Sequence, residues 1–367
     1  MNAPTHSLRV LLVTKGLDLG GIERVVVDLA TGLRARGVDV EVAVVNPRRD
    51  RLAPALEAAG VPLHRLEGSD VVGPRAARRL AALIEDSRYD IVHVHGPLPA
   101  VVARVVTRGD RLVTTSHTPS GSLRALTRAA WRLTDRLDAA SIAVSAAVAA
   151  SLPARARRRV IVIPHGIDPD RIATARDAVA ERPRTGDEVT VIAVASHRDA
   201  KNYPNLLHGL RAAIDLGASI RLVTVGDGPN LDTHRRLAQT LGLGDRVDFR
   251  PGTEDVLVEI AAADLLAVAS DYEGQPIVVA EALALGLPVV ATAVGRVPEM
   301  VNRNVGRVVP PRDPAALGAA LAELAGDADL RAEMGAVAAR QLHGWTLDDV
   351  VDAHLDVYAD VAARSPR

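Results

Sequence analysis

"LLAVASDYEGQPIVVAEALALGLPVVATAV", residues 265–294, has the pattern of a strand, a helix and a second strand. The β-branched and small apolar residues at 265–270 and 288–294 predict two buried strands. Pro276 is suited to the first position of the intervening helix, and we expect that helix to end near Leu285. A strand, a crossover helix and a second strand form the repeating unit of a parallel α/β sheet.

The same rhythm of short β-branched runs and helical segments extends along the chain in two series. The first series of runs covers residues 8–14, 38–45, 90–95, 111–117, 141–145 and 160–164. The second series covers residues 189–196, 220–226, 247–251, 265–270 and 288–294. The sequence therefore predicts an α/β protein with two Rossmann-like domains, each built on a doubly wound parallel sheet.

Composition along the chain sets the expected domain boundaries. Residues 1–170 and 189–345 carry the two series of strands and are expected to form an N-terminal and a C-terminal domain. Residues 171–188 are polar and poor in large apolar side chains, so they predict a linker. Apolar residues at helical spacing in 346–367 predict a terminal helix. A length of 367 residues suits this organisation.

The overall composition argues against several classes of protein. A net charge of -1 gives no general attraction to nucleic acid, and an aromatic content of 2% leaves few side chains to stack on bases. The absence of cysteine excludes disulfides and thiolate metal sites, and it suits a reducing cytoplasm. The first residues lack the features of a signal peptide. We therefore expect a soluble, cytoplasmic protein that binds no nucleic acid.

The loop after the first predicted strand is rich in glycine. Gly16, Gly20 and Gly21 lead into an amphipathic helix that ends near Gly37. Backbone amides at such a helix start can approach an anion closely. The spacing matches neither a Walker loop nor GxGxxG, so a tight turn that binds no ligand is an equally good interpretation.

Lysine occurs at only two positions, Lys15 and Lys201, among 44 basic side chains. Each lysine follows the first predicted strand of its domain. A compact ammonium suits a diphosphate, and Arg198 could add a planar fork to the same phosphates. The alternative is that these side chains are solvated loop charges. The place of Lys201 directly after a strand favours phosphate binding.

Two glutamates accompany the helix predicted to start at Pro276. Glu273 precedes this helix, and Glu281 lies inside its apolar run, where an ionised carboxylate is costly without a partner. A nucleotide ribose can be that partner, because both of its hydroxyls can donate to a carboxylate. Amides near Ile277 would add the positive end of the helix dipole. The alternative interpretation pairs Glu281 with an arginine in the core and leaves Glu273 in water.

The stretch that contains these glutamates closely resembles the signature of the retaining glycosyltransferases of family four. Its motif is two glutamates separated by seven residues, here Glu273 and Glu281. Other segments resemble family landmarks in the same order, namely GGIERVVVDLATGLRARG, DIVHVHGP, SIAVSAAV, VIVIPHGID, KNYPNLLHGL, VTVGDGPN and VGRVVPPRDPAAL. The resemblance implies the GT-B fold, with two facing Rossmann-like domains and a C-terminal helix that crosses back to the first domain.

The resemblance also implies roles for the residues that match the family pattern. Glu281 would hold the ribose of a nucleotide sugar, and Arg198 and Lys201 would hold its diphosphate. The amides near Gly20 and Gly21 would contact the same diphosphate from the other domain.

Further matches concern the transferred sugar. Glu273 would lie against it, and His117 matches the family histidine beside the reacting sugar. The backbone of the following segment would fix its hydroxyls and phosphate, through Gln275, Pro276, Ile277 and Val278. Gln275 and Arg296 stand where the family usually has Phe and Gly, which leaves the sugar specificity open.

The activity implied by the resemblance is transfer of a hexose-type sugar from a UDP- or GDP-sugar to a hydroxyl acceptor. The family retains the anomeric configuration and needs neither a metal nor another cofactor for this transfer. Its acceptors range from small metabolites to glycolipids. Two other functions stay open, a nucleotide-sugar epimerase or hydrolase and a nucleotide-sugar-binding protein without catalytic activity.

Two patterns that suggest metal ligands have simpler interpretations. The acidic triplet at 168–170 follows a predicted strand and is expected to cap a helix. His93 and His95 lie on one face of a predicted strand, and no third ligand is in view. We therefore expect two packed or hydrogen-bonded histidines and no metal site.

The segment 122–138 carries an arginine at every fourth position, opposite a set of leucines. A helix packed at the domain edge, with a solvated charged face, is the interpretation we favour because the net charge is near zero. A weak peripheral contact with an anionic bilayer is the alternative.

Overall fold

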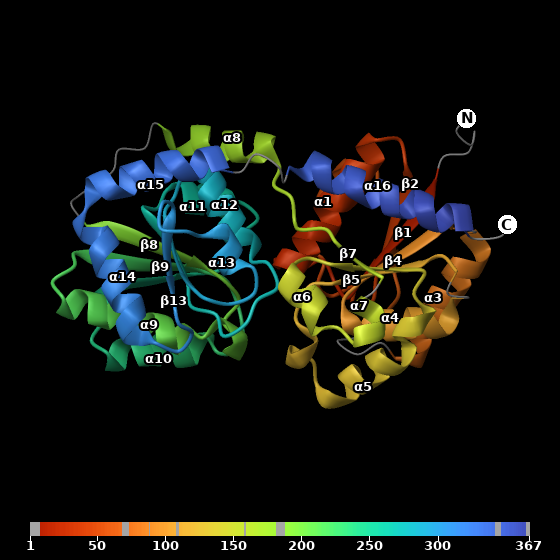
Figure 1. Cartoon of the computed structure of the whole chain (residues 1–367), viewed down its shortest axis with the longest axis horizontal. Coiled ribbons are helices and arrows are strands. Elements are labelled where there is room, and N and C mark those ends of the chain that lie inside the picture. The colour runs from red at the N-terminus through yellow and green to blue at the C-terminus, as the bar shows by residue number, and fades with distance from the viewer. Residues whose placement is uncertain are drawn as a thin grey trace. The chain divides into compact units, whose positions relative to one another are not determined.

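The computed structural model describes residues 8–67, 73–87, 89–107, 110–157, 159–180, 188–341 and 346–364. The chain folds into two compact units (Figure 1). Unit 1 combines Met1–Gly166 with Leu347–Arg367, and unit 2 comprises Ile167–Thr346.

The described part of unit 1 contains a seven-stranded parallel sheet. Its strands are β1 (Arg9–Thr14), β2 (Asp39–Val44), β3 (Leu63–Arg65), β4 (Ile91–His95), β5 (Leu112–Ser116), β6 (Ala140–Ala143) and β7 (Val160–Val162). They lie in the order β3-β2-β1-β4-β5-β6-β7. The direction of winding reverses between β1 and β4, and ligands of such sheets bind outside the carboxyl ends of the strands at this switch point.

Unit 2 contains a six-stranded parallel sheet of the same topology in its described part. Its strands are β8 (Val189–Val194), β9 (Ile220–Val225), β10 (Val247–Arg250), β11 (Leu265–Val268), β12 (Val289–Thr292) and β13 (Gly306–Val309). The order is β10-β9-β8-β11-β12-β13, so the switch point lies between β8 and β11.

Helices connect and cover the strands of each sheet. In unit 1 they are α1 (Gly21–Ala35), α2 (Ala53–Ala58), α3 (Pro74–Ser87), α4 (Pro97–Val106), α5 (Ala125–Thr134), α6 (Ala146–Ser151), α7 (Ala154–Arg157) and α16 (Leu347–Arg364). In unit 2 they are α8 (Pro169–Ala180), α9 (Tyr203–Asp215), α10 (Leu231–Thr240), α11 (Val256–Ala261), α12 (Ile277–Leu285), α13 (Val297–Met300), α14 (Pro314–Gly326) and α15 (Ala328–Gln341). Single 3₁₀ turns are η1 (Ser120–Ser122), η2 (Asp135–Leu137), η3 (Asp199–Lys201) and η4 (Gly244–Arg246).

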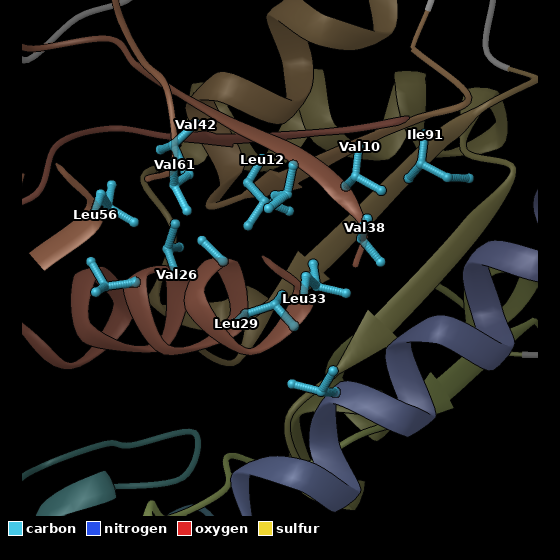
Figure 2. Close-up of a cluster of buried hydrophobic side chains, with 14 of the residues drawn as sticks. Val10, Leu12, Val26, Leu29, Leu33, Val38, Val42, Leu56, Val61 and Ile91 are labelled. Carbon is cyan, nitrogen blue, oxygen red and sulfur yellow. The ribbon is translucent and has the colours of Figure 1, made fainter. Parts of the chain in front are cut away.

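The core of unit 1 has two layers because its strands are buried on both faces. Val10 and Leu12 of β1 join the cluster under α1, whereas Leu11 and Val13 point to the opposite cluster under α3 and α4. Figure 2 shows the first of these clusters, with the side chains of α1 directed at the sheet. Burial of both faces explains why the strands read as continuous apolar runs.

Helix α16 completes the first of these clusters although it follows all of unit 2 in the sequence. It packs beside α1 (Figure 1). The two helices are so close at Gly32 of α1 that a Cβ atom there would lie 2.5 Å from Val351 Cγ2. The side chains that it adds to the core are Val350, Val351, Val357, Tyr358 and Val361. The C-terminal helix therefore crosses back to the first sheet, as the resemblance implied.

The two doubly wound sheets confirm the predicted fold class, and three segments differ from expectation. Strands β3 and β13 were not predicted from the sequence. The segment 171–188, expected to be a linker, begins inside helix α8, which buries Ile172 and Ala175 in unit 2. Residues 181–187 of that segment lie outside the described part of the chain.

Helix α5 packs against α4, but its leucines do not form the packed side. Trp131 of α5 is buried, but Leu126 and Leu133 are 88% and 72% exposed. The packed side of the helix is therefore the one that carries Trp131, which faces α4, and the arginines Arg124, Arg132 and Arg136 are solvated as expected. Nowhere in the described ranges does a helix have the length and apolar character needed to span a bilayer.

Candidate active site

The loops after β8 and β11 meet at the switch point of unit 2. Lys201 ends the 3₁₀ turn η3 in the first loop, and Glu273 lies in the second. Lys201 Nζ donates to Glu273 Oε1 at 2.5 Å, and Ser270 Oγ donates to the same oxygen at 2.7 Å. The side chains of Lys201 and Glu273 are 29% and 12% exposed. The structure thus joins two sequence-predicted residues that are 72 positions apart.

Residues that sequence reasoning did not select hold these two loops together. Asn202 Nδ2 donates to Asp271 Oδ1 at 2.7 Å, and the Asp271 amide donates to the Ala200 carbonyl at 2.8 Å. The Arg312 guanidinium donates to Asp271 Oδ2 and holds the pKa of that carboxyl below its ordinary value. Asn202 also caps α9 through its side chain. The Asn-x-Pro sequence at the start of that helix could have identified Asn202 as a structural residue of the site.

Helix α12 starts directly after the Glu273 loop. Pro276 is its N-cap residue, so the helix begins at Ile277, one position after the start expected from the sequence. The amides of Ile277 and Val278 lie in the first turn, where no carbonyl four residues earlier within the helix can accept from them. Gln275 is buried, and its Oε1 accepts from Arg296 Nη1 at 3.3 Å. The helix start therefore offers amide donors and a partial positive charge beside Glu273.

Glu281 is the single ionisable residue of α12 and is 9% exposed. The other residues of the helix are Ile, Val, Ala and Leu, and the helix lies in the core beside α15 and α11. Glu281 lies on the same helix whose start adjoins Glu273, so a ligand that extends along the switch point could contact both carboxylates.

Two glycines permit the backbone crossings that shape these loops. A Cβ atom at Gly295 would lie 2.4 Å from the Glu273 carbonyl oxygen, and the φ of Gly295 is +54°. A Cβ atom at Gly228 would lie 2.5 Å from the His197 carbonyl oxygen, directly before Arg198. Any side chain at either position would displace a loop of the candidate site. The GDG segment, from Gly226 to Gly228, thus has a packing role.

Arg198 is exposed and lies at the start of the turn that ends at Lys201. Its amide donates to the Ser196 carbonyl at 2.8 Å, and its carbonyl accepts from the Lys201 amide at 3.0 Å. The structure therefore places Arg198 in the same loop as Lys201.

The glycine-rich loop of unit 1 leads from the switch point between β1 and β4 into α1. Gly20 is the N-cap residue of α1, and Gly21 is its first residue. Glu23 was not selected from the sequence, but its carboxyl group folds back over this helix start. A Cβ atom at Gly20 would lie 2.3 Å from Glu23 Oε2. Burial raises the pKa of Glu23 above its ordinary value.

His117 follows β5 in unit 1 and lies in the middle of a buried chain of imidazoles. Its Nε2 is 3.0 Å from His95 Nδ1, and its Nδ1 is 3.1 Å from His165 Nε2. Burial lowers the pKa of His117 and of His95 well below the ordinary value, so both rings are neutral. His117 also lines a small cavity of about 20 Å³, enough for one water molecule.

His93 and His95 are packed and hydrogen-bonded, as expected from the sequence. Their ring centroids are 4.3 Å apart. His93 Nδ1 contacts the Tyr358 hydroxyl of α16 at 2.6 Å, and its Nε2 contacts Thr115 Oγ1 at 2.7 Å. Asp168 accepts from the Asp170 amide at 3.0 Å at the start of α8, which confirms the predicted cap. The described residues contain no cluster of three ligands suited to a metal ion.

Comparisons with known proteins agree with this architecture. Residues 19–171 match the family model described as Glycosyltransferase Family 4, and residues 176–341 match that described as Glycosyl transferases group 1. A D-inositol 3-phosphate glycosyltransferase from Xylanimonas cellulosilytica is 31% identical over 95% of this chain and 94% of that protein. The chain belongs to the family 4 type of glycosyltransferase.

Two further proteins resemble this glycosyltransferase. A GDP-mannose-dependent alpha-(1-6)-phosphatidylinositol monomannoside mannosyltransferase from Mycobacterium tuberculosis is 37% identical, over 47% of this chain and 49% of that protein. The crystal structure of Anabaena HepE in complex with UDP and glucose matches with a TM-score of 0.83 and 20% identity, over 96% of this chain and 100% of HepE. At this identity the match to HepE shows the fold, which is of the GT-B type.

The predicted site residues of the glycosyltransferase are divided between its units. Gly20, Gly21 and His117 belong to unit 1. The others belong to unit 2, and they are Arg198, Lys201, Glu273, Gln275, Pro276, Ile277, Val278 and Glu281.

Proposed function

We propose that this glycosyltransferase moves a hexose-type sugar from a UDP- or GDP-sugar to a hydroxyl acceptor, with retention of configuration and without a metal ion. The observation that carries the proposal is the contact between Lys201 and Glu273 at the switch point, beside the start of α12. The names of two known proteins support a nucleotide sugar, because one depends on GDP-mannose and the other binds UDP. A cytoplasmic location, in keeping with the cysteine-free sequence, belongs to the same proposal.

The donor diphosphate is assigned to Lys201, Arg198 and the first amides of α12. An ammonium has three N–H donors, and among the described residues Lys201 Nζ contacts only Glu273. Two donors therefore remain for phosphate oxygens. Negative charge grows on the phosphate as the sugar leaves, and fixed cations and amides stabilise that charge without reorganisation.

The carboxylates are assigned to the two ends of the donor. Glu281 accepts from the ribose hydroxyls, as the resemblance to the family implies. Glu273 lies against the transferred sugar, and the segment from Gln275 to Val278 fixes its hydroxyls. The neutral ring of His117 serves the sugar as a hydrogen-bonding group.

The start of α1 is assigned a separate phosphate contact through the amides near Gly20 and Gly21. Glu23 opposes this contact while its carboxyl group is ionised. Its raised pKa reduces that opposition, because the group accepts a proton more readily.

In the transfer step, the bond between the anomeric carbon and the phosphate oxygen breaks. The acceptor oxygen forms a new bond to that carbon on the same face, and its proton passes to the departing phosphate oxygen. This scheme requires no carboxylate nucleophile, in contrast to a retaining glycosidase. The hydroxyl acceptor is a small metabolite or a glycolipid, and the name of the Xylanimonas protein makes inositol 3-phosphate the first to test.

The experiment is a panel of UDP-, GDP- and ADP-sugars incubated with the whole protein, with and without inositol 3-phosphate, phosphatidylinositol or a metabolite extract. Mass spectrometry measures nucleotide release and glycosylated product, and NMR gives the anomeric configuration. We expect release that depends on the acceptor and persists in EDTA.

Three results would contradict parts of the proposal. Sugar conversion without acceptor would indicate an epimerase or hydrolase, and saturable binding alone would indicate a protein without catalytic activity. Loss of transfer in EDTA, restored by a divalent cation, would overturn metal independence.

A further inference from the structure

The outward face of α5 and η2 combines exposed leucines with arginines. Among the described residues, eight large apolar side chains are exposed, and three of them belong to this short segment. They are Leu126, Leu133 and Leu137, and Leu126 is the most exposed of the eight. Helical spacing places these leucines on one stripe, with Arg132 and Arg136 beside it. We call these five residues the Arg-Leu face.

The opposite side of α5 fixes the helix in unit 1. Trp131 is buried, and the Arg104 guanidinium of α4 lies 5.0 Å from its ring centroid. Arg104 also donates to both carboxylate oxygens of Asp138, at 2.7 and 2.6 Å, and both side chains are buried. Figure 1 shows α5 beside α4 in unit 1, in agreement with their contacts. The leucines are therefore held outward by a rigid anchor.

The segment that contains this face carries a large excess of positive charge. Residues 111–166 contain nine arginines and two aspartates, with no lysine or glutamate, in a chain of net charge -1. Both acids, Asp135 and Asp138, have buried carboxyl groups. Arg136 and Arg159 line one open hollow of about 480 Å³, and neither has an ion-pair partner within the described residues. No exposed carboxylate of this stretch opposes an anionic surface.

We propose that the Arg-Leu face docks on an anionic lipid bilayer. The leucines enter the boundary between head groups and acyl chains, where apolar area leaves water. The arginines of this face, together with Arg159 at the hollow that Arg136 also lines, contact lipid phosphates, which guanidinium groups bind in a bidentate manner. A leucine stripe flanked by arginines is the pattern of a helix that lies in the membrane interface. Charge complementarity selects this partner over an uncharged surface.

The experiment is flotation of the whole protein with phosphatidylcholine vesicles, with or without about 30% phosphatidylglycerol. No donor or acceptor is added, so the result does not depend on the proposed catalytic function. We expect binding to the anionic vesicles only. Binding should weaken by about tenfold or more when the salt rises from about 0.05 M to about 0.5 M, because exposed charges are screened.

Two pairs of substitutions separate the contributions of the face. Leu126→Gln with Leu133→Gln should lower partitioning about tenfold through lost apolar burial. Arg136→Gln with Arg159→Gln should lower it about fivefold for each arginine. All four positions are outside the anchor, so the thermal unfolding temperature should not change. The matched control is Leu216→Gln with Arg236→Gln in unit 2, where the leucine is 65% exposed, and it should bind like wild type.

Several results would overturn the proposal. These are no binding to anionic vesicles at low salt, equal binding to neutral vesicles, or equal losses in the control and the face variants. A concentration-dependent dimer that the leucine substitutions abolish, without vesicle binding, would show that a second copy covers the face. The salt dependence of wild type tests the proposal even if a variant folds poorly.

Discussion

At the scale of single residues, the candidate site depends on an ion pair that a ligand has to share. Lys201 and Glu273 neutralise each other across two loops, and Asn202 and Asp271 fix the same loops beside them. Because Ser270 also donates to Glu273, the carboxylate keeps a partner when the ammonium turns to a phosphate. The pair can therefore bind a diphosphate without leaving an isolated carboxylate.

Lys201→Ala and Glu281→Ala should each weaken donor binding. A hydrogen bond to a charged group contributes about 1.5 to 3 kcal/mol, so we expect the dissociation constant to rise about tenfold to a hundredfold. Titration calorimetry with UDP, GDP and the active nucleotide sugar measures this change. Arg221→Ala is the control, because Arg221 is exposed near the amino end of β9, at the opposite sheet edge. Unchanged affinity in both test variants would remove the nucleotide assignment.

Glu273→Ala and His117→Ala should mainly lower turnover. Both groups are assigned to the sugar end of the donor, where interactions strengthen as the bond breaks. We expect kcat to fall about a hundredfold or more, with a smaller change in KM. A rise in KM at unchanged kcat would instead assign these side chains to ground-state binding.

Glu23→Gln should strengthen phosphate binding at the start of α1. Two unit charges 4 Å apart in water interact by about 1 kcal/mol, so we expect about fivefold tighter donor binding at pH 8. The pKa of Glu23 is raised by burial, and wild type should approach the variant as the pH falls and the carboxyl group is protonated. Binding measured across pH checks this, with Glu85→Gln, at an exposed position of α3, as the control. Equal affinities for Glu23→Gln and wild type at pH 8 would argue against a phosphate at this helix start.

Sequence analysis selected most of these residues, but it did not predict which residues they contact. Glu281 stood out because it interrupts an apolar run, and Lys201 because lysine is scarce. The contact between Lys201 and Glu273 depends on the strand order, which brings together loops that are far apart in the chain. Glu23 was missed because a glutamate in the first turn of an amphipathic helix is an ordinary sequence feature.

At the scale of elements, glycine sets how closely helices approach in unit 2. Helices α9 and α14 pack together, and a Cβ atom at Gly318 would lie 2.6 Å from Ala212 Cβ and 2.7 Å from the Gly209 oxygen. The close approach lets both helices cover the same apolar face of the sheet, in a cluster that includes Leu210 and Leu317.

Gly318→Ala should therefore destabilise unit 2. In an open helix this change stabilises by up to about 1 kcal/mol, but here the added methyl group meets backbone, and overpacking costs about 1 to 3 kcal/mol. Urea unfolding measures the free energy of unfolding. Gly326→Ala in the same helix is the control, because nothing lies within 4 Å of its Cβ position. Equal effects of the two substitutions would show that α14 moves away without cost.

Long elements were predicted well, and short ones were not. The helix after Pro276 was found from the proline and the apolar run that follows it, and the terminal helix from apolar residues at helical spacing. Strand β3 has three residues, of which two are polar, and β13 begins with Gly306, so neither has a strand pattern. Helix α8 was taken for a linker because it buries few apolar side chains. Which side of α5 packs depends on the single Trp131, and the leucines on another side of the helix made that side hard to recognise from the sequence.

At the scale of the whole molecule, buried histidines make unit 1 sensitive to acid. His93, His95, His117 and His354 are buried there, and burial lowers the pKa of each, to about 4 for His354. Unfolded histidines titrate near pH 6.5, so below that pH the unfolded chain binds more protons than the folded one. The free energy of unfolding therefore falls as the pH falls from about 7 towards 4.

Calorimetry at pH 7.5 and pH 5.5 should show this loss in unit 1. His354 alone should contribute about 1 kcal/mol of it, because each differential proton is worth about 1.4 kcal/mol per pH unit. His354→Gln should reduce the pH dependence by that amount. His208→Gln, at an exposed position of α9, should leave it unchanged. A slope that His354→Gln does not alter would mean that this ring is charged in the folded protein.

The return of α16 to unit 1 sets the order of assembly during translation. Domains usually fold as they leave the ribosome, amino-terminal first. Here the whole of unit 2 leaves the exit tunnel before the residues that cover α1 and bond to His93. The first sheet to be synthesised is thus the last to be finished, and nascent chains stalled within α15 would present an open apolar core to chaperones.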